Sequence, residues 1–353
     1  MQKQMLTPLA RVLLAALLFG ASAPLAKIML GQVEPIPLAA CLYLGSGLGA
    51  SALWAAQYFR NNRLSTEARL TRPDLPWLLG AILSGGVAAP IILLVSLQQT
   101  PAATASLLLN FESVATALIA ALIFKESIGR RIGWAVGIIT LASLLLSWEP
   151  AKAGGLSAGA LGIVSACFLW GLDNNFTRNI SAKNPLAIVA IKGLGAGAFS
   201  LLLTFSLGQH FPPLAAALSA MLLGSVSYGF SIQLFILALR DLGAARSSAL
   251  FGIAPFAGAL LSMVIFRELP QTFFYFAVPV MLTGTWLMLS ERHGHHHVHP
   301  LVEHNHRHYH EDEHHQHKNP ANVPLVKGWH THPHEHTPLD HEHSHTPDLH
   351  HRH

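Results

Sequence analysis

The stretch ASLLLNFESVATALIAALIFKES, residues 105–127, decides the fold, because a later part of the chain repeats its pattern. The segment SALFGIAPFAGALLSMVIFREL, which ends at Leu269, aligns with it so that FKE at 124–126 falls on FRE at 266–268, a shift of 142 positions. A second pair, Phe19-Gly20 and Trp170-Gly171, is related by a similar shift of 151. Self-similarity over such a distance indicates that the chain consists of two related halves.

Ten apolar runs fill residues 8–290, and each has about the 20 mostly apolar residues that a membrane-spanning helix needs. They lie near residues 8–30, 36–59, 75–98, 101–124, 131–148, 157–178, 185–207, 213–239, 243–266 and 270–290. Each half holds five runs, and an odd number places the second half upside down relative to the first. Inverted repeats of this kind are typical of secondary transporters, whose site lies near the bilayer midplane where the halves meet.

The composition also indicates a membrane protein, since 51% of the residues are hydrophobic and 11% are charged, whereas soluble domains carry about 25% charged residues. The basic residues stand at the ends of apolar runs and form no patch for nucleic acid. Cys41 and Cys167 both fall inside apolar runs, where a thiol behaves as a small buried hydrophobe, so we expect no disulfide. The sequence lacks the GxxxxGK[ST] motif for ATP, and we expect a transporter and not an enzyme.

Lysine and arginine predict the orientation, because they gather on the cytoplasmic side of membrane proteins. With the N-terminus inside, fourteen of these residues face the cytoplasm, and three, Lys27, Lys152 and Arg267, face outward. Ten spans return the chain to its starting side, so both termini of this multi-pass protein of the inner (plasma) membrane are expected in the cytoplasm. The first run also resembles a signal peptide, with Arg11 before it and Ala21-Ser22-Ala23 as a cleavage site, but the repeat favours a retained helix.

At these motifs the chain resembles the EamA-domain permeases of the drug/metabolite transporter superfamily. The resemblance implies an all-α membrane fold of ten helices, with one inverted five-helix repeat at 1–148, a second at 149–292, and a tail at 293–353. The first repeat departs from the family pattern at Ser113, where the second has Pro255, so we expect a straighter fourth helix. The histidine-rich tail further resembles the cobalt and nickel resistance efflux permeases.

Glu112 is the leading candidate for a transport site, because it lies mid-way along the fourth run, where a carboxylate facing lipid is costly. Asp173 is the other acid well inside an apolar run, with Asn174 and Asn175 beside it, and Asn110 lies two residues before Glu112. Carboxylates with amide oxygen or nitrogen atoms would offset the charge of a divalent ion. The same carboxylate, once the ion leaves, would take up a proton.

Structural roles are the alternative for these polar residues. Side chains that hydrogen-bond between membrane helices often only hold a bundle together, at about 1 kcal/mol each. Glu112 could pair with Lys192 of the seventh run, and Asp173 could reach water or Arg178. His210, in the loop between the seventh and eighth runs, is more simply a solvated side chain than a ligand.

The tail differs from the rest of the chain, because residues 293–353 hold 22 of the 23 histidines. Its six prolines and few apolar residues predict a disordered segment. Neutral imidazole binds zinc, nickel and copper, and clusters on a flexible chain should hold several ions weakly. The candidate ligands are His293, His295, His296, His297, His299, His304, His306, His308, His310, His314, His315, His317, His330, His332, His334, His336, His341, His343 and His345.

We therefore predict an exporter of divalent transition metal, nickel or cobalt first and zinc second, driven by proton antiport, with the tail collecting metal at the inner mouth. The expected partners are Ni²⁺, Co²⁺ or Zn²⁺, protons and the lipid bilayer; no tightly bound cofactor and no nucleic acid is expected, and a homodimer is left open. The first alternative exports a small organic metabolite or drug and uses the tail for buffering or regulation. Others are a metal store whose helices transport nothing, an importer, and a pH-sensing tail.

Overall fold

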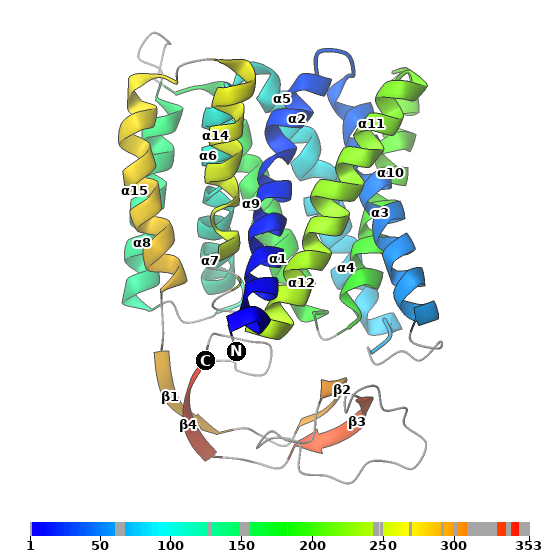
Figure 1. Cartoon of the computed structure of the whole chain (residues 1–353), viewed down its shortest axis with the longest axis vertical. Helices are drawn as coiled ribbons and strands as arrows, with labels where there is room; N and C mark the ends of the chain where they lie inside the picture. The colour runs from blue at the N-terminus through cyan, green and yellow to red at the C-terminus, as the bar shows by residue number, and fades with distance from the viewer. Residues whose placement is uncertain are drawn as a thin grey trace.

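The structure is a computed structural model that describes residues 2–60, 68–125, 129–148, 156–181, 183–242, 247, 250–267 and 270–290. It also describes the backbone of residues 293–298, 302–308, 330–336 and 340–345. Figure 1 shows that the helices stand side by side in one upright bundle.

The first half of the bundle contains the helices α1 (Gln2–Gly20), α2 (Ser22–Met29), α3 (Pro35–Arg60), α4 (Leu75–Ala81), α5 (Ala89–Gln99), α6 (Ala102–Leu108), α7 (Phe111–Leu122) and α8 (Arg130–Ser147). The second half contains α9 (Ala158–Asn179), α10 (Pro185–Ser206), α11 (Leu214–Gly224), α12 (Ser231–Leu242), α14 (Ala254–Phe266) and α15 (Thr272–Leu289). The short 3-10 helix η1 (Arg72–Asp74) precedes α4. The π-helical turn η2 (Ile82–Ala88) joins α4 to α5, and the π-helical turn η3 (Ser225–Phe230) joins α11 to α12.

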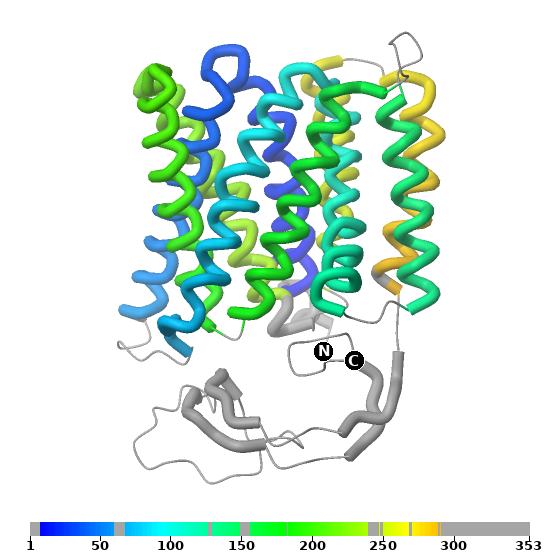
Figure 2. Tube along the Cα trace, turned by 180° about the vertical axis from the view of Figure 1, so that it is seen from behind, coloured from blue at the N-terminus to red at the C-terminus, as the bar shows by residue number. Residues whose placement is uncertain are grey.

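Helices of one half pack against helices of the other. α3 lies along α10, and α8 lies along α15 as a pair at one edge of the bundle. α1 packs on α12 and α14, while α9 packs on α5 and α7, and Figures 1 and 2 show these two groups on opposite faces. The halves are therefore interleaved, and α9 lies at the centre of the face seen in Figure 2.

Seven segments of the described residues are long and apolar enough to cross a membrane, namely Pro8–Met29, Pro35–Phe59, Arg72–Gln99, Ala102–Leu122, Arg130–Ser147, Pro185–Ser206 and Leu214–Ala238. They coincide with seven of the ten predicted runs. The other three runs are helical too: α9 ends in the polar sequence DNNFTRN, and α14 and α15 have 13 and 18 residues. The all-helical, multi-pass membrane fold is confirmed, and ten crossing helices stay a prediction.

Three local features recur in the two halves. The π-helical turns η2 and η3 interrupt the third and eighth runs at positions 143 apart, 82 and 225. The fourth and ninth runs each break at a two-residue turn, 109–110 and 252–253, directly before α7 and α14, which begin at Phe111 and Ala254. Lys125 and Arg267, aligned by the shift of 142, have φ of 57° and 52° and are the two described non-glycine residues with positive φ. Arg267 is the left-handed cap of α14, and Lys125 lies three residues after the end of α7, so the sequence repeat is also a repeat of backbone conformation at these two positions.

Glycines let the two halves approach closely. A Cβ added at Gly193 of α10 would overlap the backbone of Gly47 of α3, and one added at Gly45 would overlap the backbone of Met221 of α11. Small residues at helix crossings allow the backbones to touch, which is how membrane helices gain packing energy without a hydrophobic driving force. The glycines therefore fix the central crossing of α3 with α10 and α11.

The outer surface of the bundle is apolar. Leu122, Trp134, Leu202 and Val264 are each at least 70% exposed, which would be unfavourable in water over so large an area. In a bilayer these side chains face lipid.

Four short strands lie in the tail: β1 (His293–Val298), β2 (Val302–His308), β3 (His330–His336) and β4 (Asp340–His345). β1 pairs antiparallel with β4, and β2 with β3. Histidines that alternate with other residues fit the two-residue period of a strand, and the prediction of a disordered tail is not confirmed over these segments. The candidate ligands His299, His310, His314, His315 and His317 lie outside the described residues, and metal binding by the tail stays a prediction.

Candidate functional site

Glu112 follows a tight turn in the middle of the fourth run. The backbone N–H groups of Asn110, Glu112 and Ser113 donate three residues back, with lengths of 3.1, 3.1 and 3.2 Å, instead of four residues back as in an α-helix. The Asn110 amide donates to the carbonyl of Leu107 at 3.2 Å, and the Ser113 hydroxyl donates to the carbonyl of Asn110 at 2.7 Å. These side chains compete with the helical hydrogen bonds.

The expectation of a straighter fourth helix is therefore wrong. It rested on the lack of a proline at Ser113, whereas Asn110 and Ser113 produce by hydrogen bonding the break that accompanies Pro255 in the second half. As a consequence, α7, the helix that contains Glu112, begins at Phe111, one residue before Glu112. Its carboxylate thus lies in the first turn of a half-helix, where the helix dipole favours negative charge.

The Glu112 carboxylate contacts α9 through a neutral group. Its Oε1 accepts a hydrogen bond of 2.8 Å from the amide of Asn174, and that amide also donates to the hydroxyl of Thr116 at 3.1 Å. The Thr116 hydroxyl in turn donates to the carbonyl of Glu112 at 2.8 Å. Glu112 is half-buried and Asn174 is exposed, so this group is not sealed inside the protein.

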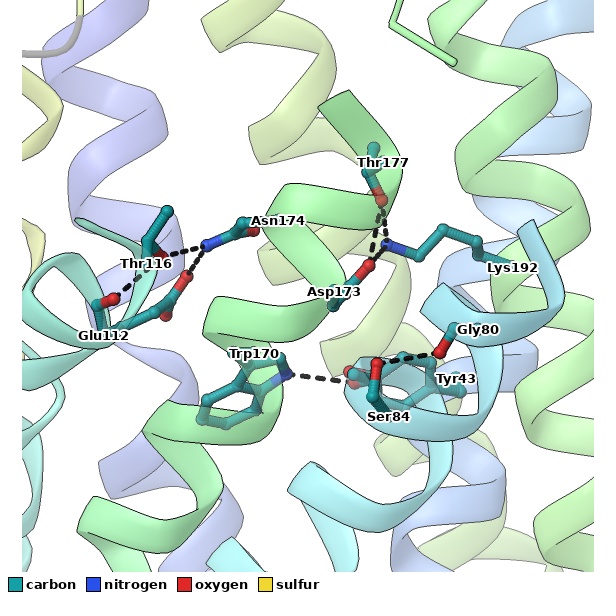
Figure 3. Close-up of polar contacts among 11 residues, drawn as sticks. Tyr43, Gly80, Ser84, Glu112, Thr116, Trp170, Asp173, Asn174, Thr177 and Lys192 are labelled. Carbon is teal, nitrogen blue, oxygen red and sulfur yellow. Dashed lines mark hydrogen bonds and ion pairs between the residues drawn. The ribbon is translucent and has the colours of Figure 1, made fainter. Parts of the chain in front are cut away.

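Asp173, the other predicted acid, forms an ion pair with Lys192. The Lys192 Nζ lies 2.5 Å from the Asp173 Oδ1, and the hydroxyl of Thr177 donates to the same oxygen at 2.9 Å. Asp173 is only 7% exposed. Figure 3 shows that Asn174 and Asp173 leave α9 on opposite sides, toward Glu112 and Lys192 respectively.

The π-helical turn η2 makes room for Asp173. A Cβ added at Gly85 would overlap the Asp173 carboxylate, so glycine is required for this approach. The carbonyl of Gly85 accepts two side-chain hydrogen bonds, from the hydroxyl of Tyr43 at 2.8 Å and from the indole N–H of Trp170 at 3.0 Å (Figure 3). Ala89 donates five residues back, to the carbonyl of Ser84, as in a π-helix. In this register the next donor, five residues after Gly85, is Pro90. Proline has no N–H, so the Gly85 carbonyl is left for the two side-chain donors.

The second π-helical turn meets the first at an aromatic cluster. Tyr228, in η3, stacks on Tyr43 with ring centroids 6.0 Å apart, and Phe19 of α1 meets Tyr228 edge-on at 5.8 Å. Tyr43 lies within electrostatic range of both Asp173 and Glu112. The corresponding turns of the two halves therefore converge on one region that contains both acids, as expected for a site between inverted repeats.

The structure separates the five predicted membrane-site residues by role. Glu112, Asn174 and Asp173 belong to the polar groups that flank α9. Asn175 is buried and donates to the carbonyls of Thr116 and Gly171 at 3.1 and 2.8 Å, which is the helix-joining role foreseen as its alternative. Asn110 is also buried and bonds within its own helix.

The structural pairing considered for Glu112 is not formed. Lys192 pairs with Asp173 and not with Glu112, although Glu112 lies within electrostatic range of both Asp173 and Lys192. The polar threonines Thr116 and Thr177 were missed. Each follows its acid by four residues, the spacing that places two side chains on one helix face, so this pattern could have identified them.

Histidine takes no part in the described site, and the Cys167 thiol lies beside the backbone of Glu112. His210 is exposed in the loop between α10 and α11, and Cys41 and Cys167 are buried free thiols. Among the described residues, no group of three or more histidine, cysteine, aspartate or glutamate side chains is placed to hold a metal ion.

Comparison with known proteins identifies the fold and the general activity. The EamA-like transporter family matches twice, at residues 8–148 and 157–290. An uncharacterized transporter of Methanothermobacter thermautotrophicus is 29% identical over 289 residues, which cover 78% of this chain and 84% of that protein. A solved crystal structure is similar with a TM-score of 0.53 and 20% identity, over 78% of this chain and 94% of the other; at this identity it shows a shared fold alone.

These similarities confirm the resemblance at the level of the family, and both named matches are transporters. The narrower resemblance to cobalt and nickel efflux permeases stays a prediction. Because the family matches two segments that together fill most of residues 8–290, the chain belongs to the EamA-like transporter family and is a multi-pass membrane transporter.

Proposed function

We propose that the protein exports a divalent transition metal from the cytoplasm, nickel or cobalt first and zinc second, in exchange for protons. The observation that carries the proposal is the Glu112 carboxylate, which is half-buried and is held at 2.8 Å by the neutral amide of Asn174. A carboxylate within a membrane bundle requires compensation of its charge. A cation or a proton supplies it.

The neighbours of Glu112 suit a hydrated cation in transit. The Asn174 amide carries an oxygen besides the N–H that it donates, and Thr116 adds a hydroxyl oxygen. One carboxylate and two neutral oxygens bind a divalent ion less tightly than a closed cage, because few ligands are charged. Weak binding suits a carrier, which must release its ion on the other side.

Proton exchange follows from the same group. When the ion leaves, the carboxylate loses its counter-charge in a poorly hydrated region and takes up a proton. The next ion displaces that proton, so one side chain carries the two species alternately. Asp173 is less suited to this role in the described conformation, because Lys192 already neutralises it at 2.5 Å.

The tail supports a metal as the cargo. It holds 22 histidines within residues 293–353, and imidazoles in such number raise the local concentration of bound ions. We propose that the tail and the N-terminus lie in the cytoplasm and that the tail delivers ions to the inner end of the bundle. The direction and the inner (plasma) membrane location are part of this proposal.

A small organic substrate is the second candidate, and a specific observation favours it. The convergence of Tyr43, Tyr228, Phe19 and Trp170 near the two acids provides aromatic faces that bind an organic cation or a ring. The lack of a three-ligand cluster among the described residues also favours this candidate over a tightly bound metal.

Cellular metal content separates the candidates. Cells that express the intact chain, the Glu112→Gln variant or a chain without residues 293–353 are loaded with nickel, cobalt or zinc, and the retained metal is measured. A metal exporter lowers retained metal, loses this effect in the Glu112 variant and keeps part of it without the tail. A metal store loses its effect on retained metal only when the tail is deleted. An organic exporter leaves nickel, cobalt and zinc unchanged in every case, which would overturn the proposal.

A further inference from the structure

A groove lies on the side of the bundle, away from Glu112 and Asp173. Its volume is about 300 Å³, and its lining comes from α15 and from the chain at the start of α14. Ile253, Phe256 and Leu282 provide apolar walls, and Thr285, Trp286 and Ser290 continue the lining to the end of α15. Because Figure 1 shows α14 and α15 at the outside of the bundle, the groove faces the lipid.

A guanidinium group borders the groove at one end. Arg131, in the first turn of α8, lies over the ring of Trp286 with its Cζ 5.2 Å from the ring centroid, and it donates a hydrogen bond of 2.6 Å to the hydroxyl of Ser290. Both partners line the groove. Two contacts thus hold the cation in place, and a guanidinium has five N–H donors, so donors are left for an anion.

The same end carries further positive potential. Arg130 is exposed beside Arg131, and both lie at the N-terminus of α8, where the helix dipole is already positive. Basic residues at this position destabilise a helix unless an anion is near. Beside Trp286 in the sequence, the Thr285 hydroxyl is buried and has no hydrogen-bond partner, so it is a polar group that a ligand in the groove would satisfy.

We propose that this groove binds one anionic phospholipid, with the phosphate at Arg131, a glycerol ester oxygen at Thr285 and an acyl chain along Ile253, Phe256 and Leu282. Tryptophan and arginine together at the end of a membrane helix match the boundary between headgroups and acyl chains. The apolar walls exclude a free metal ion, which Arg131 would also repel.

A second copy of the chain is a poorer occupant of the groove. A two-fold symmetric contact brings the same surface of both copies together, so a contact centred on this end of the groove would bring Arg131 close to its own equivalent. Such a juxtaposition of like charges is unfavourable unless an anion lies between them. The lipid accounts for both the apolar walls and the cation without a partner protein.

Quenching of tryptophan fluorescence tests the proposal on the full chain in neutral detergent. Phosphatidylglycerol or phosphatidylcholine with brominated acyl chains is titrated in, and the signal of Trp286 is taken as the difference from the Trp286→Phe variant. Phosphatidylglycerol should quench Trp286 at lower concentration than phosphatidylcholine. Arg131→Gln should weaken binding of phosphatidylglycerol about five-fold, the effect of one basic residue at a membrane surface, and leave phosphatidylcholine unchanged.

Arg130→Gln is the matched control, because it removes the same charge one residue away and Arg130 has no contact with the groove lining among those described. It should weaken phosphatidylglycerol binding clearly less than Arg131→Gln does, because it removes only a nearby charge and no contact with the groove lining. Equal quenching by the two lipids, or equal weakening by both arginine variants, would overturn the proposal. So would efficient disulfide crosslinking of two chains through Trp286→Cys, because a second copy would then cover the groove. None of these results depends on metal transport, so they leave the proposed function untouched.

Discussion

Replacing Lys192 by methionine should destabilise the bundle strongly, because it leaves the Asp173 carboxylate buried without its cation. Asp173 is 7% exposed, and its Oδ1 lies 2.5 Å from the Lys192 Nζ. Removing one partner of a buried ion pair costs about 3–5 kcal/mol. The Thr177 hydroxyl still donates to Asp173 at 2.9 Å, which offsets about 1 kcal/mol. We therefore expect the free energy of unfolding to fall by about 2–4 kcal/mol.

The double variant Lys192→Met with Asp173→Asn should recover most of this loss, because a neutral amide beside methionine leaves no uncompensated charge. The free energy is measured from reversible unfolding in mixed micelles of sodium dodecyl sulfate, followed by circular dichroism. Lys183→Met is the comparison, since its pair with Asp74 is longer, at 3.6 Å, and Asp74 keeps two hydrogen bonds of 2.7 Å from Thr71. A loss of less than about 0.5 kcal/mol of unfolding free energy in Lys192→Met would refute the buried pair. So would a double variant whose loss equals the sum of the losses of the two single variants.

Two further predictions concern the π-helical turn and the tail. Gly85→Ala should lower the free energy of unfolding by about 1–3 kcal/mol and reduce transport, because the new methyl group overlaps Asp173. Gly137→Ala adds a methyl group with nothing within 4 Å and should change neither quantity. Equal effects of the two substitutions in unfolding and transport assays would contradict the close contact. The amount of nickel bound by the full chain in equilibrium dialysis should fall as the pH drops through about 6.5, because protonated imidazole binds no metal. A chain without residues 293–353 should lose this pH-dependent binding. If the shortened chain kept the pH-dependent binding, the nickel would be bound outside the tail.

Sequence reasoning located the helices well because membrane helices have a strong signature. Long apolar runs and their ends depend on local composition, so seven of ten runs agree with the described spans. The repeat of FKE at 124–126 and FRE at 266–268 also marks a real backbone feature, the positive φ of Lys125 and Arg267.

The interruptions within helices were harder to predict. The break before α7 was missed, because a hydrogen bond from Asn110 or Ser113 to a carbonyl produces what a proline signals openly. The turn η2 has a clearer signature in retrospect, with Ser84, Gly85 and Gly86 before Pro90. Such polar and glycine-rich positions in an apolar helix often deviate from α geometry at functional sites.

The charged residues of the candidate site could be predicted from the sequence, but the ion pair that they form could not. Glu112 and Asp173 are conspicuous because acids are rare in apolar runs. Lys192 is equally conspicuous, but whether it meets Glu112 or Asp173 depends on how α10 faces α9, which no local pattern determines. The tail posed the opposite difficulty, because its composition suggested disorder while the alternation of histidine fits the strands at 302–308 and 330–336.

Proton movement in proteoliposomes tests the proposed exchange at Glu112 most directly. Purified protein is reconstituted with a pH-sensitive dye inside the vesicles, nickel is added outside, and the acidity and metal content inside are followed together. We predict that nickel entry drives protons out, that Glu112→Gln abolishes both fluxes, and that Glu34→Gln, an exposed carboxylate between α2 and α3, leaves both intact. Nickel-driven proton movement that persists in the Glu112 variant would contradict the proposal.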